Sequence, residues 1–360
     1  MHTRKRQYNI LLSSPMRYTL SADNSRAVVN SAGAELTSLC LNDSREIIWP
    51  GGYIPDEPDR WTGSAPHLFP FVGRLRGGTY SHRQKIYSMP KHGFARKSDF
   101  TVTEQCRDSL TCTLTDSPKI FQIYPFQFVF SVCFTLSENA LSIRCTIKNS
   151  GNETLFFFIG FHPGFLLSGE NAANDYAPQG VISFSKEENL TCSRIENELL
   201  SAHTSDFPLD QGMFSITDAL FKNDALIFKN IKSDTITLTC PDQLSIHINT
   251  GGAPHLGIWK RPKQQFVCIE PWYSTDESPE TKAELAQKPG ILSLPPRRAK
   301  GIYLCNLQII HHRLYLLYRS CLIFNAPSAP RCMRVNLLNF PCSHFSVISK
   351  NSTSAGHWYD

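Results

Sequence analysis

The sequence predicts an all-β protein built as a single domain. Short runs that alternate apolar and polar residues, or that are rich in β-branched residues, recur along the chain. Turn residues separate these runs at a spacing of roughly 8–12 residues, which is typical of sandwiches and barrels. Amphipathic patterns with a helical repeat are nearly absent. These three observations together favour a β-sandwich or barrel over a helical or α/β class.

The expected strands follow one another from the start of the domain. Eight runs carry the clearest pattern, at residues 17–21, 27–30, 34–41, 100–104, 110–114, 128–136, 140–149 and 235–239. Turns rich in Asn, Asp, Ser and Gly interrupt them at residues 42–44, 137–139 and 149–152. The best helical candidate covers residues 276–287, because it begins with acidic residues and ends before Pro289.

The domain is expected to cover residues 16–309. Neither an internal repeat nor a low-complexity linker occurs between Met16 and Ile309. Residues 1–15 precede it as an N-terminal extension. From His311 onward strand alternation is weak, prolines recur and acidic residues are almost absent. Residues 310–360 are therefore expected to form an atypical, poorly ordered tail, to which we assign no function.

The net charge of +5 does not describe the domain itself. The first fifteen residues carry three positive charges. The residues after Ile310 carry five basic side chains and one acid, Asp360, which is a net charge of +4. The residues between these segments therefore carry a net charge of −2. Without a basic face, a nucleic-acid partner is not expected. No segment reaches the ~18 apolar residues of a membrane helix, so no membrane partner is expected either.

Twelve cysteines are scattered singly, with no Cys-x-x-Cys pair. This argues against a zinc ribbon, and cysteines inside apolar runs, such as Cys145 and Cys268, are expected to act as small hydrophobic residues. The apolar stretch at residues 10–12 is too short for a signal-peptide core. We therefore expect reduced thiols and a cytoplasmic location. Basic and serine residues before Asp23 leave a transit peptide open as an alternative.

Three ionisable residues stand out because of their surroundings. His162 ends an apolar run just before a proline, Glu270 follows another such run, and His92 opens a turn after a proline. A carboxylate next to apolar residues is expected to have a raised pKa, which suits a group that takes up and returns a proton. Taken singly, each residue is equally typical of a hydrogen-bonded strand end.

Five motifs occur in a fixed order along the chain. They are Ala65-Pro-His-Leu-Phe-Pro-Phe-Val-Gly-Arg-Leu75, His92-Gly-Phe-Ala-Arg96, Ile159-Gly-Phe-His-Pro-Gly-Phe165, Gly257-Ile-Trp259 and Cys268-Ile-Glu-Pro-Trp272. Together they resemble the galactose mutarotase-like, or aldose 1-epimerase, superfamily and its LacX-type branch, over about residues 16–309. The resemblance implies a two-sheet β-supersandwich with a sugar cleft on one sheet, and no cofactor or metal.

The resemblance also implies roles for individual residues. Glu270 matches the general base of the family and His162 its general acid. His92 and Arg74 match residues that hold the sugar hydroxyls and the ring oxygen. Asp224 matches a sugar-binding aspartate, with Asp218 as the competing match.

Two further residues are expected in the sugar site. Trp272 offers an apolar face to the C–H surface of a sugar, as Trp61 and Phe69 could. Arg96 would meet the phosphate of a phosphorylated sugar together with Arg74. His67 stands where the family more often has an apolar residue, which leaves the shape of the pocket and the substrate open.

The leading expectation is an aldose 1-epimerase that interconverts the α and β anomers of a hexose such as galactose or glucose. The alternatives are a hexose-6-phosphate 1-epimerase and a non-catalytic carbohydrate-binding or regulatory protein. Retention of both His162 and Glu270 argues against the latter, since binding alone needs no acid–base pair. A glycosidase would need two carboxylates, and only one is well placed. Motifs of serine hydrolases, P-loop proteins and dinucleotide-binding proteins are absent.

Overall fold

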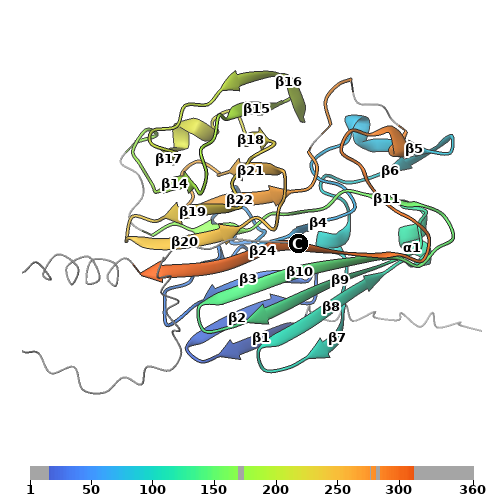
Figure 1. Ribbon diagram of the computed structural model, residues 1–360, viewed down its shortest axis with the longest axis horizontal. Coiled ribbons are helices and arrows are strands. Elements are labelled where there is room, and N and C mark those ends of the chain that lie inside the picture. The colour runs from blue at the N-terminus through green and yellow to red at the C-terminus, as the bar shows by residue number, and fades with distance from the viewer. Residues whose placement is uncertain (1–15, 169–173, 276, 281–283, 312–360) are drawn as a thin grey trace, which may run out of the picture. The chain divides into compact units, whose positions relative to one another are not determined.

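The computed structural model describes residues 16–168, 174–275, 277–280 and 284–311 (Figure 1). The predicted extension at residues 1–15 and most of the predicted tail, from residue 312, lie outside these ranges. All described residues belong to one compact unit. Strands dominate it, and the all-β class is confirmed.

One large sheet has nine antiparallel strands in the order β17-β14-β19-β20-β24-β10-β9-β8-β7. In that order they are Met213–Ser215, Val181–Phe184, Thr235–Thr239, Leu244–Asn249, Ala299–His311, Ala140–Asn149, Phe128–Leu136, Ser109–Thr115 and Thr101–Gln105. Figure 1 shows β24, the last described strand, lying between β20 and β10 in the middle of this sheet. β24 runs to His311, two residues past the expected boundary.

A second large sheet carries the site described below. Its strands follow the order β16-β15-β18-β21-β22-β12-β4, and β13 also pairs with β22. The bounds, in the same order and ending with β13, are Leu199–Asp206, Thr191–Glu196, Leu226–Lys229, His255–Trp259, Phe266–Trp272, Gly160–Phe161, His67–Leu68 and Gly164–Leu166.

Three small sheets and a few short helical turns complete the described structure. The sheets are β1-β2-β3 (Arg17–Ala22, Ser25–Asn30, Glu35–Cys40), β5-β6 (Thr79–His82, Lys85–Ser88) and β11-β23 (Leu155–Phe157, Leu292–Leu294). The helical elements are α1 (Pro118–Phe121) and the 3-10 turns η1 (Arg76–Gly78), η2 (Ala95–Lys97), η3 (Asp218–Phe221) and η4 (Leu285–Gln287). Within the described ranges, no helix has the length and apolarity needed to cross a lipid bilayer.

All eight predicted strands are present, and those at 128–136, 140–149 and 235–239 have the predicted bounds. Their alternation explains this agreement. In β9, Phe128, Phe130, Val132 and Phe134 are fully buried, and the residues that alternate with them are partly exposed. Phe69 stacks on Phe130 with ring centroids 4.6 Å apart and is itself fully buried. Phe69 is thus a core residue and not a face of the sugar site.

The helix predicted over residues 276–287 was wrong for the part of this segment that the structure describes. Only the 3-10 turn η4 forms there. The acidic residues that suggested a helix start make tertiary contacts instead. Glu277 forms a buried ion pair with Lys288, and the carboxylate of Glu284 accepts a hydrogen bond of 2.9 Å from Ser81. A parallel bridge between Ser81 and Glu284 holds the backbone extended at that point.

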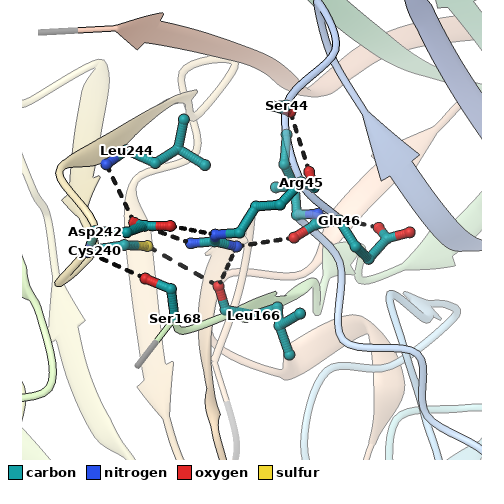
Figure 2. A network of polar contacts seen from close by, with 9 residues as sticks. Ser44, Arg45, Glu46, Leu166, Ser168, Cys240, Asp242 and Leu244 are labelled. Atoms are coloured by element: carbon teal, nitrogen blue, oxygen red, sulfur yellow. Dashed lines mark hydrogen bonds and ion pairs between the residues drawn. The ribbon is translucent and has the colours of Figure 1, made fainter. Parts of the chain in front are cut away.

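A polar network around Arg45 ties together three separate segments of the fold (Figure 2). Arg45 Nε lies 2.6 Å from Oδ2 of Asp242, in the turn between β19 and β20. Its Nη1 donates to the carbonyls of Glu46 at 2.8 Å and of Leu166, the last residue of β13, at 3.0 Å. Partial burial acts to raise the pKa of Asp242, but hydrogen bonds from Arg45 and Ser168 outweigh it and lower that pKa. The network anchors one end of β13, whose other end adjoins the candidate site.

His67 lies in the core between the two large sheets. Its side chain is fully buried, stacks on Phe161 with centroids 5.1 Å apart, and places Nε2 3.1 Å from the carbonyl oxygen of Ala34. Burial lowers the pKa of His67 to about 4, against the effect of that hydrogen bond. His67 therefore replaces an apolar residue as a neutral core histidine.

Candidate active site

Strand β22 forms the floor of the candidate site, and every residue in it is buried. Because side chains alternate along a strand, Cys268, Glu270 and Trp272 point to the same face. On one side, β12 pairs Gly160 with Trp272 and β13 pairs Gly164 with Cys268. The residue halfway between, His162, therefore lies opposite Glu270.

The imidazole of His162 and the carboxylate of Glu270 are in direct contact. His162 Nε2 lies 3.2 Å from Glu270 Oε1, and the two side chains are only 11% and 2% exposed. Pro163 follows His162 in the short gap between β12, which ends at Phe161, and β13, which begins at Gly164. Two residues 108 positions apart in the sequence thus form a cross-strand pair.

Burial and the adjacent carboxylate of Glu270 act in opposite directions on the protonation of His162. Burial lowers the pKa of His162 to about 3; a hydrogen bond with its own backbone opposes this, and the charges of Lys91 and Arg96 add to it. Trp272 Nε1 donates to Oε2 of Glu270 at 3.2 Å. This bond fixes the carboxylate and leaves Oε1 for His162. The geometry suits a pair that exchanges one proton with a ligand above it.

The Gly257-Ile-Trp259 motif makes room for Trp272. Gly257 pairs with Glu270 on the other side of β22, in β21. A Cβ atom at Gly257 would lie 2.6 Å from the Trp272 ring, closer than side-chain atoms pack. The glycine therefore allows the indole to lie over the sheet and to reach the Glu270 carboxylate.

His92 is held by two hydrogen bonds to Gly73. His92 adopts a positive φ of 66°, its backbone N–H donates to the Gly73 carbonyl at 2.7 Å, and the Gly73 N–H donates to its Nδ1 at 3.0 Å. Burial lowers the pKa of His92 well below its usual value, assisted by His162 and by cations including Arg74. Because Nδ1 accepts a hydrogen bond, the neutral ring carries its hydrogen on Nε2. His92 is therefore positioned as a neutral donor, with its ring centroid 5.6 Å from that of His162.

The turn that carries His92 requires glycine at the next position. Gly93 has a φ of 71°, and a Cβ atom there would lie 2.2 Å from the carbonyl oxygen of Phe69. Any other residue would displace one of the two segments. The His92-Gly-Phe motif is thus explained by a close approach of two backbones.

Six of the seven predicted site residues line one cavity of about 270 Å³. They are His92, Arg96, His162, Asp224, Glu270 and Trp272. Trp61 also lines it, and its indole stacks on His162 with centroids 5.2 Å apart. Arg74 is not among the lining residues, and its guanidinium instead lies 2.9 Å from Oε1 of Glu198.

The two candidate aspartates occupy different environments. Asp224 is exposed, lines the cavity and has a φ of 65°, with its Oδ1 accepting a hydrogen bond of 2.8 Å from the N–H of Ala225. Asp218 is buried and forms an ion pair of 2.8 Å with Lys260, whose side chain is fully buried. Its position is that of a structural residue, and of the two aspartates only Asp224 lines the cavity.

Sequence analysis missed four polar or aromatic features of the site. Lys91, Arg261 and Trp259 line the cavity, and Cys268 places its Sγ beside the His162–Glu270 pair. Trp259 was part of a quoted motif and Lys91 adjoins His92, so both carried a signal. Cys268 opens the last of the quoted motifs, whereas Arg261 carried no signal beyond its position next to one of them.

Potential metal ligands occur at the same place. The ligand atoms of His162, Cys268 and Glu270 all lie within 4.8 Å of one another, and all three residues are buried. The proton chemistry described above does not require a metal.

Comparison with known proteins agrees with this fold. The family model for aldose 1-epimerase matches residues 16–290. Protein LacX from Lactococcus lactis subsp. lactis is 28% identical over 278 residues, which cover 73% of this chain and 90% of LacX. The crystal structure of a galactose mutarotase related enzyme from Lactobacillus acidophilus is 28% identical, with a TM-score of 0.75, and the match covers 82% of this chain and 97% of that one. A galactose mutarotase-like protein from Lactobacillus casei is 25% identical, with a TM-score of 0.74 and coverage of 82% and 99%. The chain belongs to the aldose 1-epimerase family and has its galactose mutarotase-like fold.

Proposed function

We propose that this protein is an aldose 1-epimerase that interconverts the α and β anomers of a hexose. The observation that carries the proposal is the 3.2 Å contact between His162 Nε2 and Glu270 Oε1 on the floor of a cavity. Ligand pockets commonly measure roughly 300–1,000 Å³, so a cavity at the lower end suits a single sugar ring.

The two groups match the two oxygens that exchange protons when a hemiacetal opens. The hydroxyl oxygen and the ring oxygen are both bonded to C1. They therefore lie next to each other and can face the adjacent side chains of Glu270 and His162. Glu270 takes the proton of the C1 hydroxyl, the protonated imidazole of His162 gives its proton to the ring oxygen, and the bond from C1 to the ring oxygen breaks. Rotation about the C1–C2 bond and the reverse transfers close the ring as the other anomer.

The buried environment of His162 assists the protonation step. A lowered pKa makes its imidazolium a stronger acid than an exposed one, and a ring oxygen is a weak base. The direct contact between His162 and Glu270 lets the two side chains share one proton and keep it within the protein. A proton relay of this kind typically contributes ~10²–10⁴-fold to the rate.

Two other groups support the charge that develops on the sugar. The hydrogen bond from Gly73 engages Nδ1 of His92, which leaves its Nε2–H to donate to a ligand. Arg96 lines the same cavity, and its buried Nε has no hydrogen-bond partner among the described residues. Such preorganised donors stabilise charge where water is excluded. Arg74 stays a prediction, because it lies outside the cavity lining.

The proposal is tested by anomer exchange. Fresh α-glucose and α-galactose are followed by polarimetry and by NMR with and without the protein, together with a Glu270→Gln variant. The variant is expected to lose turnover by more than ~10²-fold while retaining sugar affinity, because it keeps the shape of the side chain and removes the base. Saturable sugar binding without any acceleration would instead identify a carbohydrate-binding protein, and unchanged turnover in the variant would remove Glu270 from the base role.

A hexose 6-phosphate is the second candidate substrate, favoured by a specific observation. Lys91, Arg96 and Arg261 all line the cavity, against the carboxylates of Asp224 and Glu270. Arginine binds phosphate with two parallel hydrogen bonds and lysine binds it as a point charge. Acceleration of glucose 6-phosphate mutarotation alone would make this the function.

The location proposed for the protein is a reducing compartment such as the cytoplasm. The nine cysteines in the described ranges are all free thiols, and six of them are buried. This supports the proposal, since disulfides form and persist in oxidising compartments.

A further inference from the structure

Three side chains that can bind zinc come together at the catalytic pair, and two of them, His162 and Glu270, line the cavity. His162 offers an imidazole nitrogen, Cys268 a thiol sulfur and Glu270 a carboxylate oxygen, all within 4.8 Å of one another. The anomer exchange proposed above uses only two of these three groups. Cys268 has no part in it, yet its sulfur lies beside both reacting atoms.

We propose that His162, Cys268 and Glu270 form a binding site for a zinc ion, or for another soft divalent metal, which occupies the catalytic pair and blocks it. The block of turnover by the metal rests on the proposed epimerase function. The binding of the metal by the three residues is independent of that function.

The geometry of the strands makes the three ligands a fixed set. Cys268 and Glu270 are two residues apart on the same face of β22, and His162 lies across from Glu270 on the neighbouring segment. Zinc bonds of about 2.0–2.3 Å imply ligand atoms about 3.4–3.6 Å apart in a tetrahedral site. The 3.2 Å between His162 and Glu270 already falls close to this spacing, and the 4.8 Å limit on the cluster leaves only a small side-chain adjustment.

The surroundings of the ligands bear on metal binding. His162 presents Nε2 to the Glu270 carboxylate at 3.2 Å, so both ligand atoms lie on the shared side of the cluster. Trp272 Nε1 donates to Oε2 of Glu270, and ligating carboxylates are commonly oriented by such a second hydrogen bond. Cys268 is fully buried and burial raises the pKa of its thiol, so the thiol loses its proton only as the zinc–sulfur bond forms. The fourth coordination position would face the cavity.

Occupancy is expected to be reversible. Metal-binding histidines usually donate their second ring N–H to a partner, and Nδ1 of His162 has no hydrogen-bond partner outside its own residue in the described structure. The site therefore lacks one support of a resident metal centre. A chelator should restore free ligands and sugar turnover together.

The experiment compares zinc binding by the full chain with that of Cys268→Ala and Cys268→Ser variants. Zinc affinity is measured by competition with a chromophoric chelator, and cobalt is substituted to reveal thiolate-to-metal charge-transfer absorption. Cys106→Ser is the matched control, because Cys106 is an exposed thiol outside the cluster. Magnesium is the metal control, since it prefers oxygen ligands.

We expect the parent chain to bind one zinc and to show the cobalt–thiolate absorption. Zinc affinity should fall by more than ~100-fold in both Cys268 variants but not in Cys106→Ser, since the loss of even an outer-shell partner can lower metal affinity 10–100-fold. Sugar interconversion in metal-free buffer should persist in the Cys268 variants and resist zinc. Equal zinc affinity in these variants, or no binding by the parent chain, would overturn the site. Zinc binding that depends on Cys268 in a protein without mutarotation would overturn the epimerase proposal only.

Discussion

The core histidine makes the stability of this protein depend on pH in a way that one substitution should remove. His67 is fully buried, and burial lowers its pKa from 6.5 to about 4. As the pH falls below 6.5, the unfolded chain binds a proton at this residue and the folded protein does not. The stabilisation is therefore complete above pH 6.5, is lost progressively as the pH falls, and is exhausted near pH 4.

The size of the effect follows from the shift. A change of about 2.5 pKa units corresponds to about 3 kcal/mol, because each unit is worth about 1.4 kcal/mol. Between pH 7 and pH 5, His67 should therefore account for a loss of about 2 kcal/mol in the free energy of unfolding. A His67→Leu variant has no group to titrate there, so its free energy of unfolding should fall by about 2 kcal/mol less over the same interval.

The assay is urea unfolding at pH 7 and pH 5, followed by fluorescence. The difference between the two pH values isolates the proton, whereas the loss of the 3.1 Å contact with Ala34 affects both conditions equally. His92 and His162 also titrate, but they do so in both proteins and cancel. His203→Leu, at an exposed histidine, is the control and should keep the parental pH dependence. Equal pH dependence in His67→Leu and the parent would refute the neutral core histidine.

Three further variants test the roles assigned to Trp272, Asp218 and Asp224. Trp272→Phe keeps an apolar ring but removes the N–H that donates to Glu270. Because a hydrogen bond to a charged group is worth about 1.5–3 kcal/mol, this variant should lower kcat about 10-fold with little change in KM in a polarimetric assay. An unchanged kcat would show that the bond does not position the carboxylate. Asp218→Ala should destabilise the protein by about 3–5 kcal/mol in urea unfolding, because it leaves the charge of Lys260 buried without its partner. Asp224→Asn should leave stability unchanged and weaken sugar binding in calorimetric titration, and the opposite pattern would exchange the roles of the two aspartates.

Local pattern predicted the all-β class and eight strands, which lie in the nine-stranded sheet and in the β1-β2-β3 sheet, but no strand of the sheet that carries the site. Strands such as β9 and β10 bury every second residue, and this alternation is written directly in the sequence. The helix predicted at residues 276–287 was wrong because an acidic start such as this one is typical of a helix N-terminus. Its true partners, Lys288 for Glu277 and Ser81 for Glu284, are tertiary contacts, one of them about 200 residues away, and no local pattern encodes them.

The residues of the site could be named from motifs, but their arrangement could not. That His162 lies opposite Glu270 depends on the register of two short strands around Pro163, which only the folded sheet defines. The same holds for Cys268, which looks like an ordinary apolar-run cysteine in the sequence. Arg74 was named by a motif match; it pairs with Glu198 and lies outside the cavity lining, and its role in sugar binding stays a prediction.

The charge of the cavity separates the two candidate substrates on physical grounds. Opening a hemiacetal needs only the pair formed by His162 and Glu270, and a neutral hexose gives Lys91 and Arg261 no charge to bind. A phosphorylated hexose would use these cations, and its binding would then weaken as salt screens them, whereas binding of a neutral sugar would not. Mutarotation measured with both sugars at low and high ionic strength therefore tests the purpose of these cations independently of the catalytic pair. A salt-insensitive KM for the phosphorylated sugar would leave Lys91 and Arg261 without a role in substrate choice.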